Sequence, residues 1–208
     1  MDNSRFNLVV VYEKFNACLL EEDDIYIKEY LESYEELNKF FDSMGTMFTF
    51  VTKELTSKMN IIVDITKENE EGFKTVKAMI AFESDKLKKS GYVSGCRTLL
   101  QLHRALDFIR LFLKSVGELQ FEENVGHVCR AAYDQTLGNH HSFFIAKGAR
   151  LAMYTLPNKA NLLKRVCGDD EEFQKSSLEA LPKTLDVTAT VFDRVQDLYT
   201  KHDLHKLP

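Results

Sequence analysis

GCRTLLQLHRALDFIRLFL, residues 95–113, forms a helical pattern that is apolar around most of its circumference. A helix of this kind is usually buried at the centre of a protein. Because successive helical residues lie about 100° apart, Arg97, Gln101 and Arg104 fall on one stripe, which Phe108 continues. The stretch therefore predicts a central helix with one face that is cationic at its start and apolar beyond.

A buried guanidinium group needs an anion or several hydrogen-bond acceptors around it. A face with a charged end and an apolar extension suits a ligand of the same shape, with an anionic head and hydrocarbon tails. The alternative is a core helix whose arginines pair with internal carboxylates. Periodicity alone favours that alternative, since structural ion pairs outnumber ligand sites.

The composition favours an all-helical protein built as a single domain over residues 1–208. Hydrophobic residues make up 44% of the 208 residues, and only 3 prolines and 9 glycines interrupt the pattern. Leu, Lys, Glu and Phe are frequent, as in helical proteins. No apolar run reaches the roughly 18–20 residues that cross a bilayer. We expect about eight helices around one core.

Charge and cysteine usage exclude several functional classes. A net charge of −5 argues against a nucleic-acid partner, which normally meets a basic surface. Four scattered cysteines show neither CxxC nor metal-ligand spacing, as expected of free thiols in a reducing compartment. The N-terminus lacks the pattern of a signal peptide. We therefore expect a cytoplasmic protein without a metal or cofactor.

Apolar periodicity and breaker residues place the other helices. Acidic residues 21–24 predict a turn, Gly91 and Gly95 a break before the central helix, and Pro182 a bend or restart in the last helix. The expected helices cover residues 6–20, 25–41, 69–89, 95–113, 121–137, 140–154, 158–166 and 171–199, with one more beginning at Asp42 or Ser43.

Two further groups of residues combine charge with an apolar stripe. Glu54 and Lys58 follow Phe50 and Val51 on the third helix, at the spacing of a favourable surface ion pair. That surface pair is one interpretation of the pattern. The other places both charges at the mouth of an apolar cleft, with Glu54 accepting hydrogen bonds and Lys58 meeting an anion.

His140 and His141 open a predicted helix that continues with two phenylalanines and two cations. Adjacent histidines without a third ligand are a poor metal signal, and a histidine at a helix start is most often a structural hydrogen-bonding group. Phe143 and Phe144, taken alone, indicate core positions, although Lys147 and Arg150 give the segment the look of a membrane-surface helix. No motif of hydrolases, metalloproteases or nucleotide-binding enzymes is present, so catalysis is disfavoured.

Four segments together resemble the glycolipid transfer protein family, and most closely its ceramide-1-phosphate transfer branch. They are GTMFTFVTKELTSKM (45–59), SGCRTLLQLHRALDFIRLFL (94–113), HHSFFIAKGARLAMYTLP (140–157) and LYTKHDLHKLP (198–208). The resemblance covers essentially the whole chain. It implies a two-layer helical fold that encloses a sphingolipid and moves it between membranes without covalent chemistry.

The resemblance also implies roles for single residues of the head site. Glu54 matches the family's acidic residue, usually Asp, that binds the ceramide amide and hydroxyl, and His141 matches the histidine at the amide carbonyl. Lys58 and Arg97 match cations of the headgroup site. Gln101 stands where the phosphate-selective branch usually has Arg and the glycolipid-selective branch has Trp. Arg104 is interpreted either as a headgroup contact or as internal scaffolding.

The expected ligand is ceramide-1-phosphate, carried by a monomer that binds membranes peripherally and transiently. Its chains are expected in an apolar pocket lined by Phe40, Phe41, Phe48, Val51, Leu55, Phe108 and Phe112. Docking on the membrane is assigned to Phe143, which matches a membrane-facing tryptophan of the family, with Lys147 and Arg150 near anionic headgroups. The alternatives are a sphingolipid sensor or adaptor, a glycolipid carrier, and a hydrolase acting on the lipid.

Overall fold

The computed structural model describes residues 5–87, 89 and 91–207, apart from the side chain of Met47. Within these residues the chain forms helices and no strand, as the composition predicts. The α-helices are α1 (Leu8–Ala17), α2 (Ile27–Ser43), α3 (Thr49–Glu68), α4 (Val76–Glu83), α5 (Gly95–Glu118), α6 (Gly126–Gln135), α7 (Phe143–Met153), α8 (Lys159–Cys167) and α9 (Glu171–Lys201). Short 3-10 turns cover Glu21–Asp23, Thr46–Phe48, Glu71–Phe73 and Leu137–His140.

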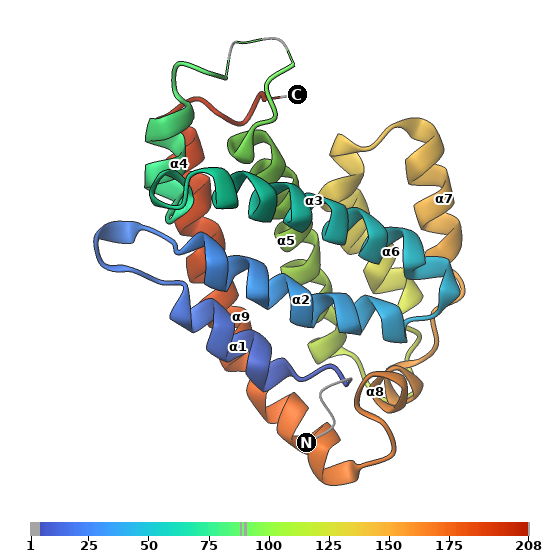
Figure 1. The fold of residues 1–208 in the computed structure, drawn as a ribbon. Helices are drawn as coiled ribbons and strands as arrows, with labels where there is room; N and C mark the ends of the chain where they lie inside the picture. Colours follow the sequence, from blue (N-terminus) through green and yellow to red (C-terminus); the bar gives the residue numbers. More distant parts are fainter. Residues whose placement is uncertain (1–4, 88, 90, 208) are drawn as a thin grey trace.

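The α-helices form two layers (Figure 1). In the view of Figure 1, α1, α2 and α3 lie side by side in front and cross α9, α5 and α6, which run roughly vertically behind them. Helix α5 is the centre of the arrangement, since it packs against α3, α4, α6 and α9. This confirms the two-layer helical fold, with nine α-helices in the described part of the chain rather than about eight.

Four helix starts differ from the sequence-based expectation by three residues or more, and one of them is α6, which begins at Gly126 instead of at residue 121. Helix α2 continues through Asp42 and Ser43, and Gly45 at φ 104° breaks the chain before α3 begins at Thr49. Helix α4 begins only after Thr75, whose hydroxyl accepts a hydrogen bond from the backbone N–H of Ala78 and so caps the helix. The segment before α7 forms a 3-10 turn, so that α7 begins at Phe143 instead of at the histidines.

The last helix is also longer and more regular than expected. Helix α9 runs without a restart through Pro182 from Glu171 to Lys201. Buried tyrosines tie its C-terminal half and α2 to the central helix. The hydroxyl of Tyr199 donates a 2.7 Å hydrogen bond to the Cys96 carbonyl, and Tyr34 donates one of 2.6 Å to the Leu102 carbonyl. These bonds fix α5 to α9 in its own layer and to α2 in the other layer.

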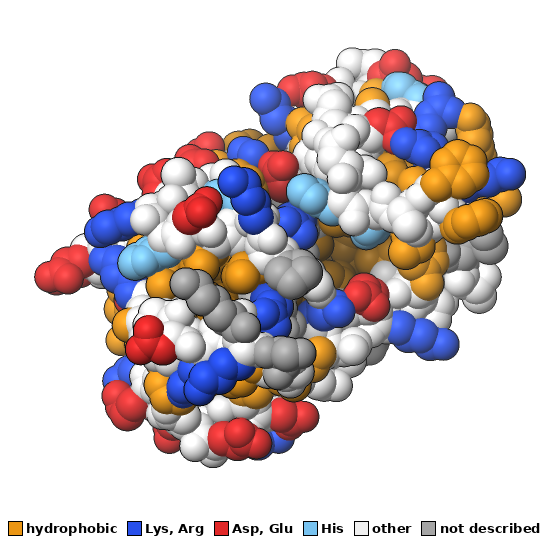
Figure 2. All heavy atoms as spheres, turned by 90° about the horizontal axis from the view of Figure 1, so that it is seen from above, with side chains coloured by type: hydrophobic (Ala, Val, Ile, Leu, Met, Phe, Trp, Pro, Cys, Tyr) orange, Lys and Arg blue, Asp and Glu red, His pale blue; other side chains and the backbone are white. Residues whose placement is uncertain are grey.

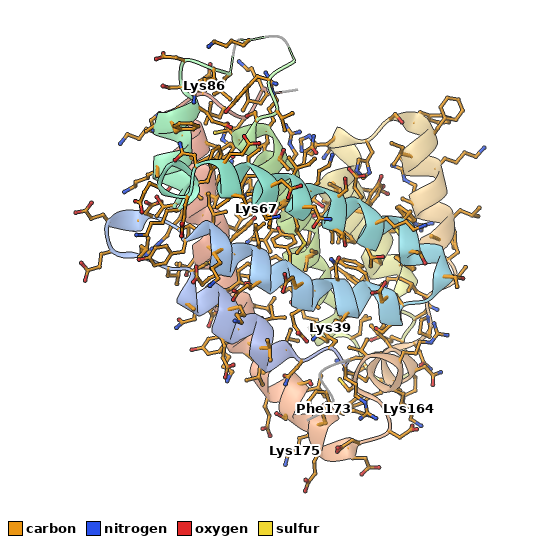
Figure 3. All side chains as sticks on the ribbon, in the orientation of Figure 1. Lys39, Lys67, Lys86, Lys164, Phe173 and Lys175 are labelled. Atoms are coloured by element: carbon orange, nitrogen blue, oxygen red, sulfur yellow. The ribbon has the colours of Figure 1, made fainter. Side chains whose placement is uncertain are left out.

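Side chains fill the space between the layers, whereas the labelled Lys164 and Lys175 lie at the lower end of the molecule, near α8 and the start of α9 (Figure 3). All four cysteines are buried free thiols. Of the helices in the described residues, none has the length and apolar character that a membrane span requires.

Candidate functional site

The upper face of the molecule carries a hollow with a hydrophobic floor (Figure 2). This face holds the start of α5 and the turn before α7 (Figure 1). Histidine, cationic and acidic side chains stand around the rim of the hollow (Figure 2). A hollow with an apolar floor and a charged rim agrees with the sequence of the central helix, which predicts a face that is cationic at its start and apolar beyond.

Glu83 fixes the start of α5, where the cationic stripe begins. Its carboxylate is fully buried and accepts hydrogen bonds from the Ser94 hydroxyl at 2.6 Å and from the backbone N–H groups of Gly95 and Cys96 at 2.7 and 2.9 Å. The Tyr92 hydroxyl donates to the same carboxylate at 3.1 Å. A carboxylate at a helix N-terminus satisfies unpaired N–H groups and interacts favourably with the helix dipole. Glu83 therefore determines where the first turn of α5 lies.

Arg97 emerges from this first turn and is held by backbone carbonyls. Its guanidinium donates hydrogen bonds to the carbonyl oxygens of Leu87 at 2.6 Å and Tyr92 at 3.1 Å. No carboxylate among the described residues lies within ion-pair distance of Arg97, and its buried Nε has no hydrogen-bond partner there. Neutral carbonyls leave the positive charge of Arg97 uncompensated. For Arg97, the interpretation that the arginines of the central helix pair with internal carboxylates is therefore wrong.

Glu54 and Lys58 form the ion pair that their spacing predicts, at 3.1 Å. The Lys58 side chain is 23% exposed and that of Glu54 is 66% exposed, so the pair stands at the edge of α3 rather than in the core. Gln101, one turn after Arg97 on α5, is half-buried, and its amide makes no hydrogen bond to another described residue. It supplies polarity to the cationic stripe without charge.

His141 interacts electrostatically with Glu54 and is oriented by Tyr133. The Nδ1 atom of His141 and the Tyr133 hydroxyl lie 2.8 Å apart. Burial lowers the pKa of His141, which keeps the imidazole neutral, while the Glu54 carboxylate opposes this shift. Burial also raises the pKa of Tyr133, so its hydroxyl stays protonated. When that hydroxyl donates to Nδ1, the imidazole proton is on Nε2, where it can be donated to a ligand carbonyl.

Arg104 lines a different cavity, of about 240 Å³, formed where α5, α9, the 3-10 turn before α7 and the C-terminal segment meet. The guanidinium of Arg104 donates a 2.8 Å hydrogen bond to the His205 carbonyl. His103 and His140 also line this cavity. The two adjacent histidines thus face different surroundings, since His141 contacts Tyr133 and His140 lies near Arg104. The hydrogen bond of Arg104 matches the scaffolding interpretation of that residue.

The residues predicted to line the apolar pocket meet at the interface between the layers. Phe40 and Phe41 of α2, Phe48, Leu55 of α3, and Phe108 and Phe112 of α5 are buried, and Val51 is half-buried. Ring centroids lie 6.2 Å apart for Phe40 and Phe112 and 5.8 Å for Phe108 and Phe112. The rings contact one another, so lipid chains would enter by separating them.

Helix α7 presents an exposed apolar face, and this corrects two expectations. Phe143 and Phe144 are 72% and 84% exposed, so neither is a core residue. Leu151 and Tyr154 are exposed on the same side of the helix. Exposed hydrophobic side chains stand out on the α7 side in Figure 2. An apolar patch of this kind indicates a membrane or protein contact.

The two cations assigned to docking on α7 differ in their surroundings. Lys147 is exposed and lies beside the apolar face. Arg150 instead forms an ion pair of 2.7 Å with Asp134 of α6 and lies over the Tyr133 ring. Arg150 thus has a partner within the protein, and its assignment to headgroups stays a prediction. Among the described residues no cluster of three or more His, Cys, Asp or Glu side chains is placed to hold a metal.

Three features of the site were missed at the level of sequence. Glu83 lies in a segment with ordinary helical periodicity, and only the fold brings it against the start of α5. Tyr133 lies within the helix expected over 121–137, and nothing in the sequence marks its hydroxyl as the partner of His141. Phe144 was assigned to the core because exposure cannot be judged from two adjacent phenylalanines. A weak signal existed for Phe144, since Phe143, Phe144, Lys147 and Leu151 share one helical face.

The chain is similar to known proteins in both sequence and fold. The profile of the family described as Glycolipid transfer protein matches residues 25–168. The ceramide-1-phosphate transfer protein of Danio rerio is 34% identical over 98% of each chain, and that of Mus musculus is 31% identical over both full lengths.

Solved structures show the same fold at a similar level of identity. The crystal structure of the mouse ceramide-1-phosphate transfer protein, in its apo form, has a TM-score of 0.89 at 29% identity and covers 98% of this chain and 100% of its own. The human protein in complex with 12:0 ceramide-1-phosphate has a TM-score of 0.87 at 30% identity, with the same coverage. Because the family profile matches most of the chain and full-length relatives share its sequence and fold, this protein belongs to the glycolipid transfer protein family.

Proposed function

We propose that this protein carries a phosphorylated sphingolipid, of which ceramide-1-phosphate is the prime candidate, between membranes. The observation that carries the proposal is Arg97, whose uncompensated charge lies on the stripe of α5 that continues into the buried aromatic cluster at Phe108 and Phe112. The relatives at 31% to 34% identity are named ceramide-1-phosphate transfer proteins, which supports the same lipid class here.

In this proposal the ceramide amide meets Glu54 and His141, and the phosphate meets Lys58 and Arg97. Glu54 accepts from the amide N–H, and the Nε2 proton of His141 is donated to the amide carbonyl. The Arg97 guanidinium exchanges its hydrogen bonds to backbone carbonyls for hydrogen bonds to the phosphate. Lys58 interacts with the phosphate and with Glu54 at the same time. The site provides binding groups, and the proposal includes no covalent step.

The hydrocarbon chains enter between the layers. Each methylene removed from water contributes about 0.8 kcal/mol of favourable free energy. Two exposed hydrocarbon chains would therefore be costly in water, so a protein must enclose them during transfer. Phe40 of α2 and Phe112 of α5 touch across the interface, so the chains are admitted as α2 and α3 separate from α5. Docking is assigned to the α7 face, where Phe143 and Phe144 enter the membrane surface beside Lys147. The proposed setting is the cytoplasm, with transient peripheral binding of a monomer to membranes.

The test is transfer of fluorescent ceramide-1-phosphate from donor to acceptor vesicles. We expect Arg97→Leu to slow transfer at least about tenfold, because hydrogen bonds to charged groups contribute about 1.5–3 kcal/mol. Arg165→Leu removes an equal charge from an exposed position on α8 and should leave transfer unchanged. Normal transfer by Arg97→Leu would remove the phosphate assignment.

The same assay separates a carrier from a sensor or adaptor. A sensor would take up lipid from donor vesicles and release it slowly, so that lipid stays on the protein when acceptor vesicles are added. A hydrolase would convert labelled ceramide-1-phosphate into a product that chromatography resolves. Retention of the lipid or its conversion would each replace the carrier proposal.

A further inference from the structure

We infer that the cavity of about 240 Å³ beside Arg104 is a second binding site, for a small water-soluble molecule that carries a phosphate group and a hydroxyl. This second site is separate from the proposed lipid site and does not depend on it. A cation, several hydrogen-bond donors and an unpartnered acceptor meet in the wall of the cavity, and each of them fits a part of such a ligand.

Four segments of the chain form the wall. Arg104 comes from α5 and Gln196 from α9, whereas His140 ends the 3-10 turn before α7 and His205 lies in the C-terminal segment. The volume of about 240 Å³ is below the roughly 300–1,000 Å³ of pockets for drug-sized ligands, so the cavity suits a small molecule. The apolar side chains of the wall are those of Leu100 and Phe192. Two such residues are too few to hold a hydrocarbon chain, which favours a water-soluble ligand.

Arg104 gives the cavity a positive charge that lacks a carboxylate partner. Its guanidinium donates a 2.8 Å hydrogen bond to the neutral carbonyl of His205, and no carboxylate of a described residue lies within ion-pair distance of it. Asp107 also lines the cavity, but its carboxylate is paired with Arg110 at 2.9 Å. The remaining N–H groups of a guanidinium match the oxygens of a phosphate, to which arginine forms paired, charge-assisted hydrogen bonds.

Two neutral side chains add donors around this charge. The Oε1 atom of Gln196 lies 2.8 Å from His103 Nε2, which leaves the amide N–H₂ of Gln196 without a partner among the described residues. Burial and the nearby Arg104 charge lower the pKa of His140, so its exposed imidazole is neutral and offers one N–H. With Arg104, the donors come from three segments. Donors on several sides suit a tetrahedral phosphate better than a planar carboxylate.

His103 supplies the acceptor that a ligand hydroxyl requires. Its ring is 2% exposed, and burial lowers its pKa to about 4, so the imidazole is neutral. Because Gln196 Oε1 accepts a hydrogen bond, the ring proton is on Nε2 and Nδ1 is left as an acceptor. This Nδ1 atom is buried and has no partner among the described residues. A buried polar atom without a partner is costly, and a hydroxyl in the cavity would satisfy it.

The test is titration of the protein with sn-glycerol 3-phosphate at fixed pH and ionic strength, followed by the imidazole NMR signals of its six histidines. We expect the His140 signal to move, because a bound phosphate opposes the lowering of its pKa by burial and by the Arg104 charge. His127, exposed on α6, is the internal control and should not respond. Glycerol has the hydroxyls without the charge, so an equal response to glycerol would overturn the inference.

Two arginine variants separate the second site from the lipid site. Arg104→Gln should weaken binding of glycerol 3-phosphate at least about tenfold, because charge-assisted hydrogen bonds are roughly twice as strong as neutral ones. Arg97→Leu removes a charge from the proposed lipid site and should leave this binding unchanged. Loss of binding in Arg97→Leu together with normal binding in Arg104→Gln would mean that the phosphate occupies the lipid site. That outcome would overturn the inference and leave the proposed function standing.

Gln196→Glu is the second test, for the case that Arg104→Gln shows a thermal transition unlike the wild type. The new carboxylate can still accept from His103 Nε2 but places a negative charge in the cavity, so binding should again fall at least about tenfold. Gln120→Glu adds the same charge at an exposed position beyond the other end of α5 and is the control. Normal binding by folded Gln196→Glu would contradict a phosphate in this cavity. A response to vesicles containing phosphatidic acid, with none to glycerol 3-phosphate, would replace the soluble ligand by a lipid headgroup and overturn the inference.

Discussion

The Ser94 hydroxyl donates a 2.6 Å hydrogen bond to the carboxylate of Glu83, so that the last residue of α4 holds the N-cap residue of α5. The same carboxylate accepts from the first two backbone N–H groups of α5. The cationic stripe begins only two residues later, at Arg97. The position of the head site therefore depends on a buried acidic residue outside it.

Glu83→Gln should destabilise the protein by about 2–3 kcal/mol, because it removes charge-assisted hydrogen bonds and turns an amide N–H₂ towards backbone N–H groups. Urea denaturation followed by circular dichroism measures the change. Glu118→Gln, on an exposed residue at the other end of α5, is the matched control and should change stability by less than about 0.5 kcal/mol. Equal stabilities for the two variants would show that Glu83 does not hold α5.

Tyr133→Phe removes the hydroxyl that orients His141. We expect lipid transfer to fall about fivefold, corresponding to the roughly 1 kcal/mol of one hydrogen bond, without a comparable loss of stability. Tyr12→Phe removes the hydroxyl of a half-buried ring on α1, outside the site and the docking face, and serves as the control. A transfer rate for Tyr133→Phe equal to that of the control would mean that His141 is oriented by other contacts.

Phe144→Ala should weaken binding to vesicles about tenfold, because the side chain is 84% exposed and a buried phenylalanine contributes about 1.5–3 kcal/mol. Co-sedimentation with vesicles measures the partition. The stability of the folded protein should stay within about 0.5 kcal/mol of the wild type, since the ring makes few contacts in the core. Phe121→Ala, on a half-exposed ring in the loop between α5 and α6, is the control. A similar loss in both variants would mean that binding is not specific to the α7 face.

His103 should make stability depend on pH. Its ring is 2% exposed and stacks on Phe192 with centroids 4.3 Å apart, and burial lowers its pKa from 6.5 to about 4. The unfolded chain therefore binds a proton at a higher pH than the folded protein does. Stability is complete above about pH 6.5 and is lost as the pH falls from there towards 4.

Between pH 7 and 5.5 this histidine should reduce the free energy of unfolding by about 1 kcal/mol. His103→Gln lacks the titrating group, so its loss of stability over the same range should be smaller by that amount. Urea titrations at the two pH values give the four free energies. Parallel pH dependences for the two proteins would show that His103 keeps a normal pKa in the fold.

Much of the fold was determined by local sequence pattern. The predominantly apolar circumference of residues 95–113 required a buried helix, and the periodicity of the other segments required helices to cover it. The ion pair of Glu54 and Lys58 also follows from spacing along one helix. The direction of Arg97 and Gln101 relative to each other is set by helical geometry, because both lie on α5.

Tertiary structure decided what depends on residues far apart in the chain. Whether Arg97 would meet a carboxylate or carbonyls was settled by the path of the chain between α4 and α5, and the separation of His141 from His140 by the turn before α7. Phenylalanine is a typical core residue, and only the packing of α7 on α6 left Phe143 and Phe144 exposed. Helical periodicity determines which side chains share a face of a helix. Which other helix packs against that face depends on the free energy of contacts between the layers, and these contacts involve segments that are far apart in the chain.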